Sequence, residues 1–357
     1  MKKCAYLATV FGCMLLMPLA PVPAQADDVV VGVNLDNKPD QLTPQEQNVI
    51  LDDMKAAGVR IIRAGIADND KSLDFVQRVY AHGIQIEWGT FGVPSPSGNM
   101  ILSSADPAKF RAYLQPLFAK LEGKGIVLAG IELGNEINLS NHDLGATGTG
   151  RVLTLEDLSS DPKGRQVAKG YLQYIKLLAV LKDVRDHSLL NRHTPIISAG
   201  LSPIEPPSTG SKNDAVSLTA TLRFLRANGM DQFVDGYGVH WYPRGDVAPA
   251  AWLSDLQQHI FAECGSVASG GKPCWLTEWG LPVSSGKSCP VVDVKRTAIF
   301  SEWRNDFKQF AQQGRLKGLF LYTWKGGIID NRDDENPYGA FICGAVTKSG
   351  RLAVEPM

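Results

Sequence analysis

Two short stretches of the sequence each end an apolar run in a glutamate. The first is GIELGNEIN at 130–138, which carries Asn135 and Glu136, and the second is CWLTEWG at 274–280, which carries Glu278. Two such carboxyl groups can cleave a glycosidic bond: one donates a proton to the leaving oxygen while the other, ionised, attacks the anomeric carbon. The retaining form of this reaction needs them about 5 to 5.5 Å apart, and neither step needs a metal. The structural alternative for Glu136 is a carboxylate that caps the next helix.

The surrounding pattern predicts the elements that would position these glutamates. Short β-branched or apolar runs alternate with longer amphipathic stretches, which indicates βα units around a parallel sheet. We expect strands at 29–35, 59–65, 84–88, 126–134, 195–200, 234–240, 274–278 and 318–324, and helices at 44–57, 73–82, 107–121, 166–186, 217–228, 251–264 and 292–313. The fold class is therefore α/β, a (β/α)₈ TIM barrel formed by one domain at 27–357, with a last helix that is short or irregular.

The two glutamates fall at the ends of the fourth and seventh expected strands and would face each other across the barrel mouth. Loops at 92–98 and 201–212 would lie on the same face, where active sites of this fold are built. Strand alternation places Glu132, Gly134 and Glu136 on one side, so Asn135 reaches the site only if the strand bulges or ends there, and we expect a bulge. Glu132, one layer deeper, is expected to be a buried, paired structural carboxylate.

The pair Asn135-Glu136 followed by Thr277-Glu278-Trp279-Gly280, in this order on an eightfold βα chain, resembles the glycoside hydrolases of clan A. The resemblance implies that Glu136 is the acid/base. It also implies that Glu278 is the nucleophile that forms a glycosyl-enzyme intermediate.

The resemblance covers further strand ends. It implies that Arg63 keeps the nucleophile ionised, that His240 or Tyr242 orients it, that Asn135 binds the 2-hydroxyl of the sugar, and that Trp324 offers a flat apolar face to a pyranose ring.

Each of these residues also has a structural interpretation. His240 and Tyr242 could be satisfied residues of the core rim, Arg63 could pair with Glu132, and Trp324 could fill the barrel top. Other aromatic residues near strand ends could form sugar platforms, but alternation favours packing against helices for two of them, Trp241 and Trp279, and leaves Trp88 open.

The family within the clan stays open. Ile137 stands where clan members often have proline. The segment ELGNE is similar to the heparanase and β-glucuronidase branch, whereas the segment around Glu278 is similar to the branch of β-xylosidases and exopolysaccharide hydrolases. The sugar, the linkage and the choice between endo and exo action stay open with it.

The N-terminus predicts export. A basic MKK start, an apolar run and the small-residue triplet Ala24-Gln25-Ala26 form a signal peptide at 1–26, and the mature protein would be secreted or periplasmic without a membrane span. A membrane anchor and a lipoprotein through Cys13 are weaker alternatives.

Four cysteines remain after cleavage, and they allow three pairings. We favour Cys264 with Cys274 and Cys289 with Cys343, because the first pair closes a short loop and the second could tie the loop after Glu278 to the C-terminal segment. No CxxC or HxxxH spacing supports zinc.

The charge balance, 36 basic against 37 acidic residues, gives no basic face for nucleic acid. We expect a monomer that acts on a polysaccharide or oligosaccharide and needs no cofactor. The rival classes are a non-catalytic carbohydrate-binding barrel, a transglycosylase with the same glutamates, and a metal-dependent barrel hydrolase, for which only His240 stands at a strand end.

Overall fold

The computed structural model describes residues 29–35, 39–90, 101–139, 143–144, 148–207, 212–243, 249–283, 289, 291–325 and 337–357. The expected signal peptide at 1–26 and the expected loop at 92–98 lie outside these residues. The expected loop at 201–212 is described at 201–207 and 212.

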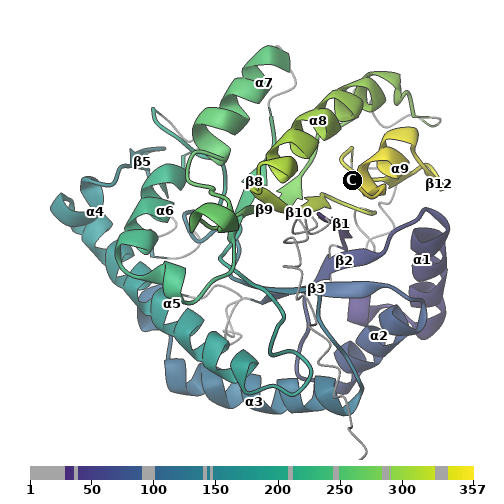
Figure 1. Cartoon of the computed structure of the whole chain (residues 1–357), viewed down its shortest axis with the longest axis horizontal. Helices are drawn as coiled ribbons and strands as arrows, with labels where there is room; N and C mark the ends of the chain where they lie inside the picture. Colours follow the sequence, from purple (N-terminus) through teal and green to yellow (C-terminus); the bar gives the residue numbers. More distant parts are fainter. Residues whose placement is uncertain are drawn as a thin grey trace, which may run out of the picture.

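Eight parallel strands form one sheet that curls into a nearly closed barrel at the centre of the molecule (Figure 1). Parallel bridges from Ile197 to Gly236 and from Leu201 to Val239 join the two end strands. The strands follow the order β6-β4-β3-β2-β1-β10-β9-β8, with bounds β1 Val30–Asn34, β2 Ile61–Ala64, β3 Gln85–Thr90, β4 Gly130–Leu133, β6 Ile196–Ile197, β8 Tyr237–Trp241, β9 Cys274–Trp279 and β10 Leu316–Leu321. All eight predicted strands are confirmed, although β4 and β6 are much shorter than predicted.

Helices surround the strands, as Figure 1 shows, and the predicted (β/α)₈ class is confirmed. The last helix, α9, has seven residues and packs beside α8, in agreement with the expectation of a short final helix. The bounds are α1 Pro44–Ala56, α2 Asp70–Ala81, α3 Pro107–Gly123, α4 Asp157–Ser160, α5 Pro162–Asp186, α6 Leu218–Ala227, α7 Pro249–Asp255, α8 Val294–Gln312 and α9 Lys348–Val354.

Two predicted helix boundaries were wrong by four residues or more. Helix α5 begins four residues earlier than predicted, because the Asp161 carboxylate accepts the backbone N–H groups of Lys163 and Gly164 and a proline occupies the first helical position. The helix predicted to reach Cys264 ends as α7 at Asp255, and a π-helical turn, Leu256–Ile260, follows it.

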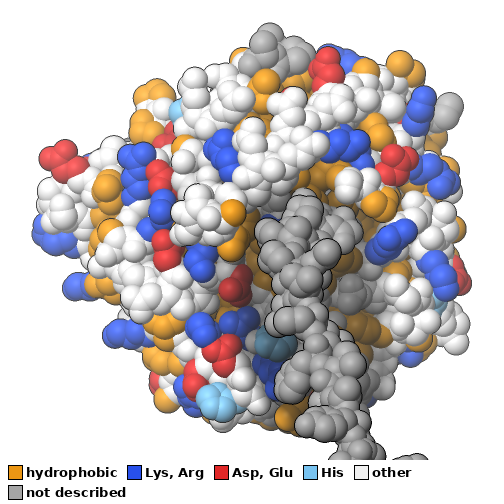
Figure 2. All heavy atoms as spheres, in the orientation of Figure 1, with side chains coloured by type: hydrophobic (Ala, Val, Ile, Leu, Met, Phe, Trp, Pro, Cys, Tyr) orange, Lys and Arg blue, Asp and Glu red, His pale blue; other side chains and the backbone are white. Residues whose placement is uncertain are grey.

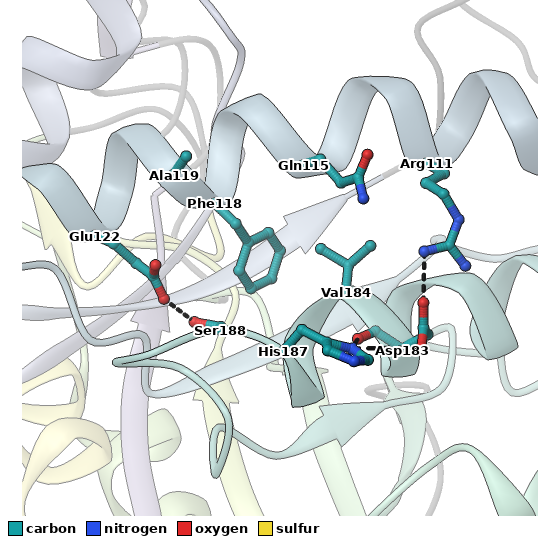
Figure 3. A pocket seen from close by; sticks show the side chains of 9 residues that line it. All are labelled: Arg111, Gln115, Phe118, Ala119, Glu122, Asp183, Val184, His187 and Ser188. Carbon is teal, nitrogen blue, oxygen red and sulfur yellow. Dashed lines mark hydrogen bonds and ion pairs between the residues drawn. The ribbon is translucent and has the colours of Figure 1, made fainter.

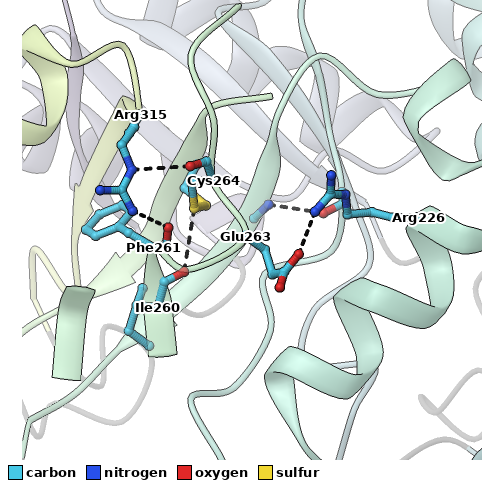
Figure 4. The surroundings of a disulfide bond; sticks show 9 residues. Arg226, Ile260, Phe261, Glu263, Cys264 and Arg315 are labelled. Atoms are coloured by element: carbon cyan, nitrogen blue, oxygen red, sulfur yellow. Dashed lines mark hydrogen bonds and ion pairs between the residues drawn. A yellow bond between two sulfur atoms is a disulfide. The ribbon is translucent and has the colours of Figure 1, made fainter. Parts of the chain in front are cut away.

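The chain after this turn is held by Arg315, which donates to the carbonyl oxygens of Phe261 and Cys264 (Figure 4). In the same region Arg226 of α6 pairs with Glu263 at 2.5 Å. Arg315 thus binds two backbone carbonyl oxygens that a continued helix would have paired with its own N–H groups, in agreement with the end of the helix before Cys264.

Two disulfides link Cys264 to Cys274 and Cys289 to Cys343, with Cα–Cα distances of 5.4 and 5.7 Å. They confirm the favoured pairing. The first closes the connection between the π-helical turn and β9, and the second joins the segment after β9 to the C-terminal hairpin of β11 Phe341–Ile342 and β12 Ala345–Val346. This hairpin and the parallel pair of β5 Val152–Leu153 with β7 Ala215–Val216 were not predicted, because two-residue strands carry no periodicity.

An aromatic layer packs β8 and β9 against α8. The ring centroids of Trp241 and Trp303 are 4.4 Å apart, and those of Trp279 and Phe307 are 5.3 Å apart. Trp241 and Trp279 therefore face the helices, as strand alternation predicted. Inside the barrel Trp275 lies so close to Gly318 that a Cβ there would meet its ring at 2.0 Å.

The surface carries no large patch of one charge over the described part of the face in Figure 2, where Lys and Arg side chains are interspersed with Asp and Glu. None of the described helices is both long and apolar enough to cross a membrane.

Candidate active site

The fourth barrel strand ends abruptly and turns two consecutive side chains into the barrel mouth. Strand β4 ends at Leu133, Gly134 has a φ of +92°, and Glu136 has a φ of +48°, in the left-handed region that residues other than glycine rarely adopt. The Glu136 N–H donates to the Gly200 carbonyl at 2.7 Å and holds this conformation. Asn135 and Glu136 can thus both reach the site because the strand ends before them, and not through the bulge that was expected there.

The seventh barrel strand reaches the site through a bulge. The pairing of β8 with β9 shifts between Val239, opposite Leu276, and His240, opposite Glu278. The extra residue on β9 is Thr277, and the bulge turns consecutive side chains inward. Thr277 Oγ1 donates to Glu132 Oε1 at 2.9 Å, while the next side chain, that of Glu278, contacts Arg63.

Three of the residues singled out in the sequence contact Glu278. Arg63 Nη1 donates to Oε1 at 2.8 Å, the Tyr242 hydroxyl donates to Oε2 at 2.5 Å, and His240 Nδ1 lies 3.5 Å from Oε2. Burial by itself raises the pKa of Glu278, but the positive charges of His240 and Arg63 outweigh it, and the pKa lies below its ordinary value. The hydrogen bonds from Tyr242 and Arg63 act in the same direction. Glu278 is therefore held as a carboxylate.

Glu136 shares His240 with Glu278. His240 Nδ1 lies 3.1 Å from Glu136 Oε1 and 3.5 Å from Glu278 Oε2, so these two oxygens are no farther apart than the sum of the two distances. Only a collinear arrangement would reach that limit, which is the lower edge of the about 6.5 to 9.5 Å found in inverting glycosidases. The limit applies to the nearest oxygens and includes the about 5 to 5.5 Å of a retaining pair.

The two carboxyl groups differ in exposure. The Glu136 side chain is 28% exposed and that of Glu278 is 13% exposed. His240 is fully buried; burial lowers its pKa, but the charge of Glu278 and the contact with Glu136 raise it above its ordinary value.

Arg63 connects the site to the barrel interior. Its Nη2 donates to Asn135 Oδ1 at 2.9 Å, its Nε donates to Glu132 Oε2 at 2.5 Å, and its Nη1 also reaches Asn34 Oδ1 at 2.7 Å. The pairing with Glu132, which was the structural alternative for Arg63, and the contact with Glu278 thus exist together. Burial lowers the pKa of Arg63, but the charges of Glu132 and Glu278 raise it far above its ordinary value, so the guanidinium keeps its charge.

Several residues of this network were not predicted from the sequence. Asn34 donates to the Thr277 carbonyl at 2.9 Å, and Glu87 lies 3.6 Å from Arg63 Nε. The signal that could have identified Asn34 and Glu87 is that each is a polar residue within an apolar strand. Tyr322 and Tyr338, whose rings lie 5.9 and 5.8 Å from that of Tyr242, gave no such signal because ring contacts depend on the tertiary fold.

Trp324 lies near the site but inside the core. Its side chain is 1% exposed, its ring centroid lies 6.0 Å from that of Phe341, and its backbone N–H donates to the Asn34 carbonyl at 2.9 Å. Its stacking on a sugar stays a prediction. Trp88 is also buried and packs on Phe118 at 6.1 Å.

A separate cavity of about 430 Å³ lies between α3 and α5, in the outer helical layer (Figure 3). Its charged groups are already paired, Arg111 with Asp183 and Glu122 with Ser188. The glutamates Glu136 and Glu278 do not line it. Among the described residues there is no cluster of three or more His, Cys, Asp or Glu side chains able to hold a metal ion.

The fold is that of the (β/α)₈-barrel glycosidases among solved structures. A fungal β-1,4-galactanase matches with a TM-score of 0.53 and 17% identity over 91% of this chain and 93% of its own. A β-glucosidase from Thermotoga maritima matches with a TM-score of 0.54 and 13% identity over 91% and 96%. The exo-β-1,4-mannosidase from Opitutaceae bacterium strain TAV5 matches with a TM-score of 0.55 and 16% identity, and this chain spans 58% of it. No protein-family model matches the sequence, and no curated protein matches it.

Proposed function

We propose that this protein is a retaining glycosidase that cleaves β-linked polysaccharides or oligosaccharides, with Glu278 as the nucleophile and Glu136 as the acid/base. The observation that carries the proposal is the arrangement of both carboxyl groups on one histidine nitrogen, at 3.1 and 3.5 Å, with Arg63 bonded to Glu278. Glu278 is stabilised as an anion, which suits a nucleophile.

In the first step Glu136 transfers its proton to the glycosidic oxygen while a Glu278 oxygen attacks the anomeric carbon. The bond to the leaving group breaks, and an ester between the sugar and Glu278 forms. In the second step the ionised Glu136 takes a proton from water, whose oxygen attacks the anomeric carbon and releases Glu278 as a carboxylate. The negative charge of Glu278 is consumed in the first step and restored in the second.

Arg63 and Tyr242 support this cycle because both donate to the oxygens of Glu278 and neither changes its protonation state. The same guanidinium bonds Asn135 Oδ1 at 2.9 Å and thereby fixes the orientation of the amide that we assign to the 2-hydroxyl of the sugar. The β linkage is supported by the names of the structural neighbours, a β-1,4-galactanase, a β-glucosidase and an exo-β-1,4-mannosidase.

We also propose that the protein is exported as a single catalytic domain at 27–357 after removal of 1–26, and that it acts as a monomer. The two disulfides support an oxidising compartment outside the cytoplasm.

The test is hydrolysis of a panel of aryl β-glycosides, β-glucans, xylans, mannans, galactans and acidic polysaccharides. We expect Glu278→Ala and Glu136→Ala to abolish turnover, and azide to restore Glu278→Ala with formation of a glycosyl azide of inverted configuration. Glu302→Ala, which removes an exposed glutamate on α8, is the control and should retain full activity.

Loss of activity in the Glu302 variant as well would point to general damage rather than to a catalytic pair. Binding of a glycan without cleavage, unchanged in both glutamate variants, would instead assign the protein to carbohydrate-binding barrels. Transfer of the sugar to a second glycan in place of water would identify a transglycosylase.

A further inference from the structure

Three carboxyl groups surround one guanidinium beneath the site. Arg63 Nε lies 2.5 Å from Glu132 Oε2 and 3.6 Å from Glu87 Oε2, while its Nη1 lies 2.8 Å from Glu278 Oε1. The side chains of Glu87 and Glu132 are 0% exposed. Burying an ionised carboxylate is costly unless it is paired and hydrogen-bonded, so a single cation cannot serve all three equally.

The hydrogen bonds distinguish the two deep carboxyl groups. Glu132 uses both oxygens, one for Arg63 Nε at 2.5 Å and one for Thr277 Oγ1 at 2.9 Å. Neither oxygen of Glu87 has a hydrogen-bond partner within the described part of the chain. Glu132 has the environment of an anion, and Glu87 has that of a neutral acid. In agreement with this difference, burial and the nearby charge of Glu132 raise the pKa of Glu87 well above its ordinary value.

The guanidinium is planar, so fixing one of its nitrogens fixes the direction of the others. Glu132 holds Nε from the barrel interior, which leaves Nη1 directed at Glu278 and Nη2 directed at Asn135. Without this hold Arg63 could turn about its side-chain bonds, and Nη1 and Nη2 would no longer be directed at Glu278 and Asn135.

We propose that Glu132 is a positioning residue, which aims Arg63 at the nucleophile and at Asn135, and that Glu87 stands beside it as an uncharged carboxylic acid. The proposal rests on the proposed function in that Glu278 must be the nucleophile. It goes further by assigning roles to two buried residues that touch no substrate.

The groups around these carboxyl groups define the electrostatics. Glu132 is faced from β2, β3, β8, β9 and α5, and Glu278 is faced from β2 and β8 together with residues that follow β4 and β8. The titratable or charged groups among them are Arg63, Glu87, Glu136, Tyr174, His240 and Tyr242, together with Glu132 and Glu278 themselves.

Two effects of the variant Glu132→Gln oppose each other. Removal of a negative charge would by Coulomb's law alone lower the pKa of Glu278. Loss of the ionic hold on Arg63 releases the guanidinium from the nucleophile and raises that pKa. The positioning role therefore predicts a rise where simple charge removal predicts a fall. Glu87→Gln is the matched control, because it replaces a neutral acid with a neutral amide of the same shape.

The experiment is a carbon-13 NMR titration of the purified protein labelled at the glutamate carboxyl carbons, with the Glu278 signal assigned by its loss in Glu278→Gln. We expect Glu132→Gln to raise the pKa of Glu278 by about one unit, a tenfold change in its ionisation equilibrium. We expect Glu87→Gln to leave it unchanged. The acid limb of kcat/KM should move in the same way in each variant.

A pKa of Glu278 that falls or stays constant in Glu132→Gln would overturn the positioning role. An equal shift in Glu87→Gln would overturn the neutral state of Glu87. If Glu132→Gln fails to fold, Thr277→Val is the second variant, because it removes one of the two hydrogen bonds that orient Glu132. It should raise the pKa of Glu278 by a smaller amount, and no rise would count against the positioning role of Glu132. The titration needs no turnover, so an inactive wild-type protein would reject the proposed function while the NMR result still decides the position of Arg63.

Discussion

Removal of the Tyr242 hydroxyl should change the acid side of the activity profile. The hydroxyl donates to Glu278 Oε2 at 2.5 Å, and the Glu278 side chain is only 13% exposed. A hydrogen bond to a charged group contributes about 1.5 to 3 kcal/mol. Because one pKa unit corresponds to about 1.4 kcal/mol, Tyr242→Phe should raise the pKa of Glu278 by about one to two units.

The assay is kcat/KM against pH with an aryl β-glycoside, in which the acid limb reports the ionisation of the nucleophile in the free enzyme. The wild-type limb should lie below the ordinary glutamate value of about 4.3, and the Tyr242→Phe limb should lie about one to two units above the wild-type limb. Activity should therefore fall most at mildly acid pH and less near pH 7, where Glu278 stays ionised in both proteins.

The same change should affect stability with a defined sign. Because the folded-state pKa of Glu278 is lower than its unfolded value, its ionised form contributes to stability above the unfolded pKa, and this contribution is lost as the pH falls through the folded pKa. Tyr242→Phe should reduce that contribution, so that its free energy of unfolding at neutral pH drops and depends less on pH in the acid range.

Tyr80→Phe is the control, because its hydroxyl donates to the Val127 carbonyl at 2.5 Å in the outer helical layer. It can lower stability but should leave the acid limb in place. An acid limb that stays in place in Tyr242→Phe, or one that moves equally in Tyr80→Phe, would refute the assignment of Tyr242 as a donor that keeps the nucleophile ionised.

Two further changes test the packing of the site and the covalent links. Gly200→Ala would place a Cβ within 2.3 to 2.6 Å of polar atoms of the site network, so we expect a loss of about 1 to 3 kcal/mol in unfolding free energy and a lower kcat/KM. Gly123→Ala is the control and should be tolerated, because a Cβ there would have no atom within 4 Å. Equal behaviour of the two variants would contradict the close packing around Gly200. Replacing both cysteines of Cys289–Cys343 with serine should lower the free energy of unfolding by about 4 kcal/mol, against about 3 kcal/mol for Cys264–Cys274, because the sequence separations are 54 and 10 residues. Denaturant unfolding measures both losses. A larger loss from the shorter loop would reject the loop-entropy argument.

The sequence was sufficient for the barrel and for the two catalytic candidates. The eight strands were predictable because each is a short apolar run with helical periodicity on either side, which is a local signal. Glu136 and Glu278 were predictable because each ends such a run, and parallel strands of a barrel end at the same face. Helix boundaries were less accurate, since Asp161 and Pro162 form a cap that lies before the apolar period begins.

The contacts between side chains could not be read from local patterns. Arg63 and Glu278 are 215 residues apart, and Asn34 and Thr277 are 243 residues apart, so no local pattern contains their contact. The left-handed conformation of Glu136 and the bulge at Thr277 depend on pairing with neighbouring strands, which turns adjacent residues to the same side and overrides simple alternation.

The order of elements and the placement of carboxyl groups at strand ends thus follow from local sequence, whereas the charge states of those groups follow from the folded arrangement. An ionised group is stabilised or destabilised by atoms a few ångströms away in space, and burial strengthens each such interaction by excluding water. Glu87 and Glu132 are alike in sequence, two glutamates within apolar strands, yet one has hydrogen bonds to both oxygens and the other has none among the described residues.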